Sequence, residues 1–80
     1  MEIQEKLQHY EGLVKLQSRP IPNKDEILRV IKKTNLLLRA GSFEAVAYNF
    51  GILHCLLLIA GILKHEETVE DANEVFHNFR

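Results

Sequence analysis

Few residues of this 80-residue chain have the types and spacing that catalysis or metal binding needs. Glu74 and His77 follow the Glu-x-x-His spacing, which places both side chains on one face of a helix, as in di-iron carboxylate bundles. Such bundles use two of these pairs and two further glutamates, whereas this chain has a single pair. Apolar residues at helical spacing are expected to occupy the inward face of this segment. We therefore interpret Glu74 and His77 as part of a solvated acidic surface. The sequence therefore predicts no metal site.

The remaining polar residues do not form a catalytic set either. His65 is followed by Glu-Glu-Thr-Val and lacks the second histidine of the zinc-binding HExxH helix. His54 and Cys55 are adjacent, so on a helix they point about 100° apart and cannot serve each other as base and nucleophile. The four glycines are scattered rather than gathered in a phosphate-binding loop. We therefore predict a protein that is not an enzyme and has no cofactor.

Apolar residues recur at steps of three and four throughout the chain, which is typical of helices. We predict a small all-α bundle in one domain, residues 1–80, with helices at about 2–18, 24–40, 43–65 and 69–79. At the second helix, Asn23 and Glu26 have the spacing of a capping box, and Gly41 suits the left-handed position after its end. Ser42 is placed to cap the third helix.

The segment from Ala45 to Leu63 has nineteen residues and no charge, which is close to the length that spans a bilayer. Its aliphatic residues favour insertion, whereas Tyr48, Asn49 and His54 oppose it. The other three helices each have one apolar face that must be buried against a neighbour. A central apolar helix surrounded by these faces buries all of them, whereas a lone membrane span buries none. We therefore expect a bundle with a central apolar helix and disfavour a membrane location.

Small residues form a stripe along the same segment. Ala47, Gly51 and Cys55 lie four residues apart, a spacing that lets two helix backbones approach closely. Three helices with one apolar face each cannot cover a long apolar helix well, so we expect two copies of the chain to complete the bundle as a homodimer. The alternative is that the stripe accommodates a helix of the same chain.

His54 and Asn49 interrupt the apolar segment and need hydrogen-bond partners wherever they are buried. We interpret them as structural residues that are satisfied within the chain or make a polar contact across the dimer, which can fix the register of two helices. His54 is accordingly grouped with Ala47, Gly51 and Cys55 as a dimer-packing residue. A ligand-binding role for His54 is the alternative.

Charge is unevenly distributed along the chain, although the net charge is only −1 and gives no overall basic character. Residues 15–39 hold seven cations and two acids, a net charge of +5, and residues 66–80 hold five acids and one cation, a net charge of −4. These segments can pair within or between chains. The single cysteine excludes an internal disulfide, and the first ten residues lack the apolar core of a signal peptide, so we expect a cytoplasmic protein.

Two surfaces are candidates for binding a partner. The second helix carries a basic arc, which suits the phosphates of nucleic acid or of a nucleotide and consists of Arg29, Lys32, Lys33 and Arg39. The candidates for contact with a protein are two leucines outside the apolar arc of that helix and four acids of the last segment, namely Leu28, Leu36, Glu66, Glu67, Glu70 and Glu74. We predict that the protein binds another macromolecule, as an adaptor, a regulator or an inhibitor. An anion-binding module that uses the basic arc is the alternative.

Overall fold

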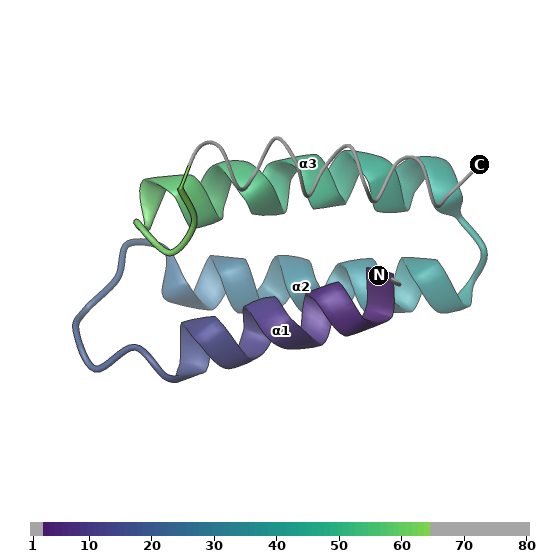
Figure 1. Cartoon of the computed structure of the whole chain (residues 1–80). Helices are drawn as coiled ribbons and strands as arrows, with labels where there is room; N and C mark the ends of the chain where they lie inside the picture. Colours follow the sequence, from purple (N-terminus) through teal and green to yellow (C-terminus); the bar gives the residue numbers. More distant parts are fainter. Residues whose placement is uncertain (1–2, 65–80) are drawn as a thin grey trace.

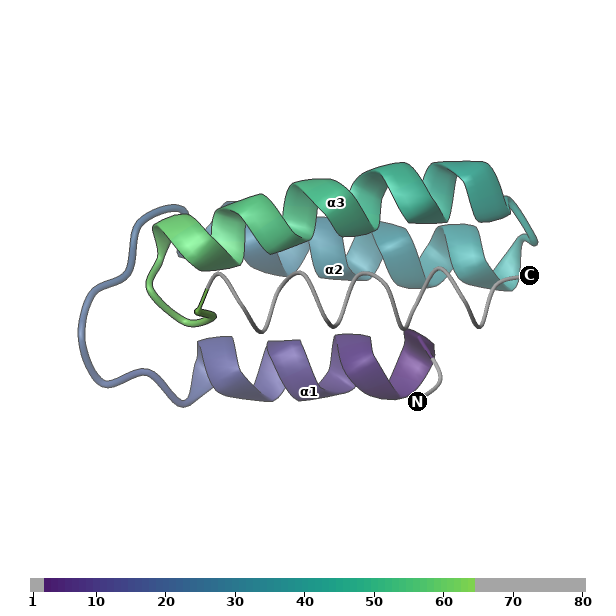
Figure 2. The ribbon, with the colours of Figure 1, turned by 45° about the horizontal axis from the view of Figure 1, so that its top comes forward.

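The computed structural model describes residues 3–64 and contains three helices in this range, α1 (Ile3–Lys15), α2 (Lys24–Arg39) and α3 (Phe43–Ile59), with no strand among these residues. Successive helices run antiparallel, and α2 packs along both α1 and α3 (Figure 1, Figure 2). The predicted all-helical bundle is confirmed to this extent. The predicted helix at 69–79 lies outside the described residues.

The core is built from one face of each helix, as the helical spacing predicts. The side chains with no exposed surface are Leu7, Tyr10 and Val14 of α1, Ile27, Ile31 and Thr34 of α2, and Val46, Phe50, Leu53 and Leu57 of α3. Full burial of each aliphatic member contributes about 1.5–3 kcal/mol relative to exposure. The sequence does not predict Thr34 in this set. Its hydroxyl donates to the Val30 carbonyl oxygen at 2.6 Å, which satisfies the polar atom without a partner from another helix.

Although α3 is apolar on all sides, the described helices do not enclose it. Its residues Tyr48 and Ile59 are 72% and 64% exposed. Within residues 3–64 it is α2 that packs along both other helices, so the expectation of α3 as the central helix is not met in this part of the chain. A helix of 17 residues is about 25 Å long. No helix in the described range is long and apolar enough to cross a membrane.

Both α2 and α3 end on a glycine with a left-handed backbone. Gly41 has a φ of 77° and closes α2, as the sequence predicts. Gly61 has a φ of 73°, and its amide donates to the Leu58 carbonyl oxygen at 3.0 Å. The Ile62 amide donates to the Leu57 carbonyl oxygen at 3.0 Å, which completes a Schellman motif. The predicted extension of the third helix to residue 65 is therefore wrong, because Gly61 turns the chain before the apolar run is finished.

The loop between α1 and α2 is tied to the end of α3. Arg19 Nη2 donates to the Ala60 carbonyl oxygen at 3.1 Å, where a cation also interacts favourably with the negative end of the helix dipole. Pro20 and Pro22 disfavour helical backbone in the residues before them. The first helix ends at Lys15 rather than at about residue 18, so it stops before the residues that these prolines restrict.

The predicted side-chain caps are wrong at both helix starts. Asn23 has a φ of 58° and makes no side-chain cap hydrogen bond, because a capping side chain usually requires extended backbone that aims it at the first amides. Ser42 also makes no such bond. The Ile27 amide donates to the Asn23 carbonyl oxygen at 2.9 Å, and the Val46 amide donates to that of Ser42 at 3.0 Å. Both helices also carry acidic residues in their first turns, which the helix dipole favours.

The left-handed turn at Gly61 predicts that Gly61→Ala lowers the free energy of unfolding by about 1 kcal/mol or more. An added Cβ would lie 3.2 Å from Arg19 Nη2, so the guanidinium would also have to shift. Gly12→Ala is the matched control, because Gly12 lies inside α1 and a Cβ there meets no atom of the described residues within 4 Å. We expect it to raise stability by about 0.5–1 kcal/mol. Urea unfolding followed by circular dichroism measures both, and equal effects would contradict the assigned end of α3.

Candidate binding site

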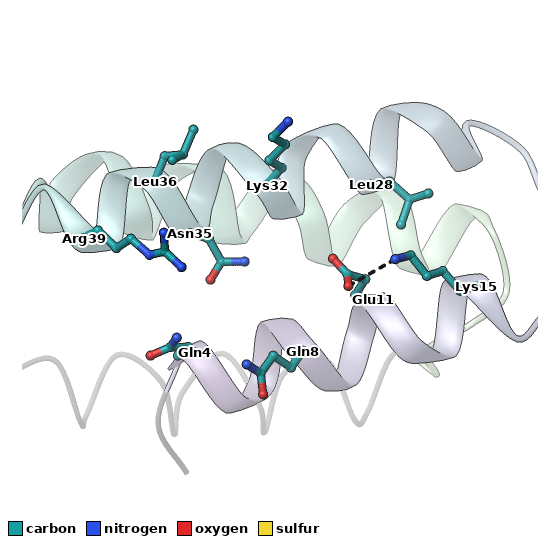
Figure 3. A pocket seen from close by; sticks show the side chains of 9 residues that line it. All are labelled: Gln4, Gln8, Glu11, Lys15, Leu28, Lys32, Asn35, Leu36 and Arg39. Carbon is teal, nitrogen blue, oxygen red and sulfur yellow. Dashed lines mark hydrogen bonds and ion pairs between the residues drawn. The ribbon is translucent and has the colours of Figure 1, made fainter.

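A groove of about 530 Å³ runs between α1 and α2, and we call it the α1–α2 groove. Its lining residues are Gln4, Gln8, Glu11 and Lys15 from α1 and Leu28, Lys32, Asn35, Leu36 and Arg39 from α2 (Figure 3). It therefore combines apolar, amide and charged side chains from two helices.

The helical period explains why these residues line one groove. On α1 the lining residues recur at steps of four, three and four, and each directly follows a core-facing residue, as Gln8 follows Leu7. On α2, three of the five lining residues follow the same rule: Leu28 follows Ile27, Lys32 follows Ile31 and Asn35 follows Thr34. The core faces hold the two helices together, and the adjoining faces then flank the seam between them. The packing of the core thus fixes the position of the groove.

The two ends of the groove differ in chemistry. Because α1 and α2 are antiparallel, Gln4 lies at the same end as Arg39, and Lys15 lies at the same end as Leu28 (Figure 3). Arg39 and Asn35 extend toward α1, whereas Lys32 and Leu36 point away from it (Figure 3). One end therefore offers a guanidinium among carboxamides, and the other offers a leucine beside charged residues.

The groove has an excess of positive charge. Three of its lining residues are cations, and one, Glu11, is an acid. Lys15 Nζ lies 3.3 Å from Glu11 Oε1, and both side chains are partly exposed to water, so this pair contributes at most about 1 kcal/mol. Lys32 and Arg39 are exposed and make no ion pair or side-chain hydrogen bond within residues 3–64. No acid of the described residues neutralises these two cations.

The groove unites residues that the sequence analysis assigns to two different partners. Lys32 and Arg39 belong to the predicted basic arc, and Leu28 and Leu36 belong to the predicted protein-binding residues. The other two cations of the arc, Arg29 and Lys33, are exposed on α2 but do not line the groove. The acidic candidates Glu66, Glu67, Glu70 and Glu74 lie outside the described residues.

Sequence reasoning missed the five other lining residues, Gln4, Gln8, Glu11, Lys15 and Asn35. Their signal is their position directly after a core residue, but it becomes usable only when the pairing of α1 with α2 is known. The sequence does not specify which faces of two helices adjoin.

On α3 the structure separates His54 from the predicted dimer stripe. Ala47 and Gly51 are half-buried and Cys55 is an exposed free thiol, whereas His54 is 4% exposed. Its Nε2 lies 3.3 Å from the Tyr10 Oη of α1, within hydrogen-bonding distance. His54 therefore packs inside the chain, on a different face of α3 from Cys55. The physical reason is the turn of about 100° between His54 and its neighbour in the stripe.

The surroundings of His54 and Asn49 support their interpretation as structural residues. The Phe50 ring meets the His54 ring edge-on, with centroids 4.5 Å apart. Tyr10 also packs on Phe50, with ring centroids 5.9 Å apart. Asn49 Nδ2 donates to the Ala45 carbonyl oxygen at 2.7 Å, one turn earlier in the same helix. Both buried polar side chains of this helix thus have hydrogen-bond contacts within one chain.

Residues 3–64 contain no group of three or more His, Cys, Asp and Glu side chains that could hold a metal ion. Glu74, His77 and His65 lie outside this range, so the predictions about them stay predictions. Comparisons with protein families, with curated proteins and with solved structures found no match for this chain. Its function must therefore be argued from the described surfaces.

The buried contact between Tyr10 and His54 predicts that Tyr10→Phe lowers the free energy of unfolding by about 1 kcal/mol, the usual net contribution of a hydrogen bond. Tyr48→Phe removes the same hydroxyl from a side chain that is 72% exposed, and we expect a change within about 0.5 kcal/mol. Chemical unfolding of the two variants beside the wild type provides the measurement. Indistinguishable effects would show that the Tyr10 hydroxyl does not support the fold.

Proposed function

We propose that this protein is a non-enzymatic binding module that contacts another protein through the α1–α2 groove, as an adaptor, a regulator or an inhibitor. The observation that carries the proposal is the meeting, in one groove, of two accessible leucines with two cations that have no ionic partner within residues 3–64. Leu36 is 56% exposed, and Leu28 is half-buried. Apolar anchors beside hydrogen-bonding and charged groups are typical of surfaces that bind proteins.

Phosphate binding by the basic arc is the second candidate function. Exposure of all four cations of the arc supports it, because each is accessible to a phosphate. The composition of the groove weighs against it. The described groove has no aromatic side chain on which a base can stack, and Arg29 and Lys33 do not line it. The groove thus favours a protein partner.

We further propose that the protein forms a homodimer through the outer α3 face, which consists of Tyr48, Gly51, Cys55 and Ile59. These residues follow steps of three, four and four along α3. The chain has no charged residue between Glu44 and Lys64, so this face offers no charge to an ionic partner. A second copy brings an equally apolar surface, and the small residues on the face permit close approach. The outer α3 face and the α1–α2 groove share no residue.

Leu36→Glu tests the proposed function, because a buried carboxylate opposes docking of a partner on the groove. Leu16→Glu is the matched control, since Leu16 is 82% exposed and does not line the groove. We expect proteins captured from native cells by the wild type to be captured equally by Leu16→Glu and lost with Leu36→Glu, as measured by quantitative mass spectrometry. Equal capture by both variants, or no capture above a tag-only control, would refute binding through the groove.

Gly51→Leu tests the dimer. A Cβ at Gly51 meets no atom of the described residues within 4 Å, so we expect the single chain to keep its fold while the helices of two copies are forced apart. Analytical ultracentrifugation at micromolar concentration should show a dimer for the wild type and a monomer for the variant. Gly12→Leu on α1 is the control and should remain dimeric. A monomeric wild type under these conditions rules out the proposed dimer.

A further inference from the structure

Apolar and cationic residues alternate along the groove-lining face of α2. Leu28, Lys32, Leu36 and Arg39 follow one another at steps of four, four and three residues. At 1.5 Å per residue this row is about 17 Å long, or three turns of helix. The row therefore presents apolar and positive contacts in a fixed order.

We infer that the partner segment is an amphipathic helix on which acidic and apolar residues alternate at the same spacing. This inference rests on the function proposed above and specifies the partner. Apolar side chains of the incoming helix would lie against Leu28 and Leu36, and carboxylates would lie against Lys32 and Arg39. Helices bind in grooves through contacts at such three- and four-residue intervals.

Two features of the groove favour a helix over an extended peptide. Peptides that bind as strands need an exposed sheet edge, and residues 3–64 contain no strand. Peptides in the polyproline conformation need a groove lined with aromatic rings, whereas the nine residues of the α1–α2 groove include none. A seam between two antiparallel helices instead offers a straight, ridged surface that another helix can follow.

Charge complementarity favours acids on this helix. Lys32 and Arg39 have no ionic partner within residues 3–64, and Lys15 is already paired with Glu11. A basic helix would therefore meet two uncompensated cations. An acidic helix gains two charge-assisted contacts, which become stronger as the groove loses water.

The groove also determines which part of the partner helix carries the acidic residues. Arg39 can bind a carboxylate through two parallel hydrogen bonds, and the neighbouring amides of Gln4 and Asn35 can donate further ones (Figure 3). At the other end, Lys15 is already paired with Glu11, so a carboxylate placed beside Leu28 meets no unpaired cation of the described residues. We therefore expect the acids of the partner at the centre and at the Arg39 end, with an apolar residue over Leu28.

The test uses a labelled helical peptide that carries leucine, glutamate, leucine and glutamate at steps of four, four and three residues. Its control peptide has both glutamates replaced by glutamine. Fluorescence anisotropy measures binding to the wild type and to two double variants with the same change in charge. Lys32→Glu with Arg39→Glu alters the groove, whereas Arg29→Glu with Lys33→Glu alters exposed cations outside it.

We expect the groove variant to weaken binding of the acidic peptide about tenfold or more, as the loss of two exposed ion pairs implies. The Arg29/Lys33 variant should stay within about threefold of the wild type. The glutamine peptide should bind the wild type about tenfold more weakly than the acidic one, and this comparison needs no folded variant. Higher salt should weaken only the acidic peptide.

Three results would overturn the inference. If the acidic peptide does not bind while Leu36→Glu still abolishes capture of native proteins, the groove remains the site but its partner is not an acidic helix. If the glutamine peptide binds as tightly as the acidic one, the alternating charges do not select the partner. If duplex DNA binds instead, and both double variants lose it alike, the whole basic arc binds phosphate.

Discussion

The described structure depends on the contact that joins its first and last helices. Tyr10 of α1 has no exposed surface, lies 3.3 Å from His54 Nε2 and packs on the ring of Phe50. This cluster connects residues 44 positions apart in the sequence. Because Tyr10 faces inward, its neighbour Glu11 faces the seam with α2. The packing of α1 in the core therefore also positions the residues of the candidate site. The groove has its present lining only while α1 remains docked.

The sequence was sufficient to locate the three described helices and most of their core residues, because a helix buried on one face has apolar residues at intervals of three to four. The inward positions Leu7, Tyr10 and Val14 follow directly from that period. The backbone conformation at the helix ends was harder to predict from the sequence. The apolar pattern continues past Gly61, so hydrophobicity alone cannot reveal that α3 has already ended. Asn23 likewise has a side chain that can form a capping box, but its left-handed backbone prevents the capping hydrogen bond.

The candidate site was predicted in fragments for a related reason. Composition and period identified Lys32, Arg39, Leu28 and Leu36, but as parts of two separate surfaces. Only the antiparallel pairing with α1 shows that they share a groove with carboxamides and an acid. In the proposed dimer each copy would keep its own groove, since no residue belongs to both surfaces. A partner with two suitable helices would then gain avidity without any new contact.

The hydrogen bond between Arg19 and Ala60 has a consequence for the motion of α1. The linker that follows α1 is anchored at Arg19, so a locally detached α1 would swing from that anchor rather than from the start of α2. Only the few residues between Lys15 and Arg19 would then act as a flexible tether. A shorter tether confines the free helix to a smaller volume and lowers the entropy cost of redocking. The C-terminal end of α3 thereby lowers the entropy cost of reforming a groove to which it contributes no lining residue.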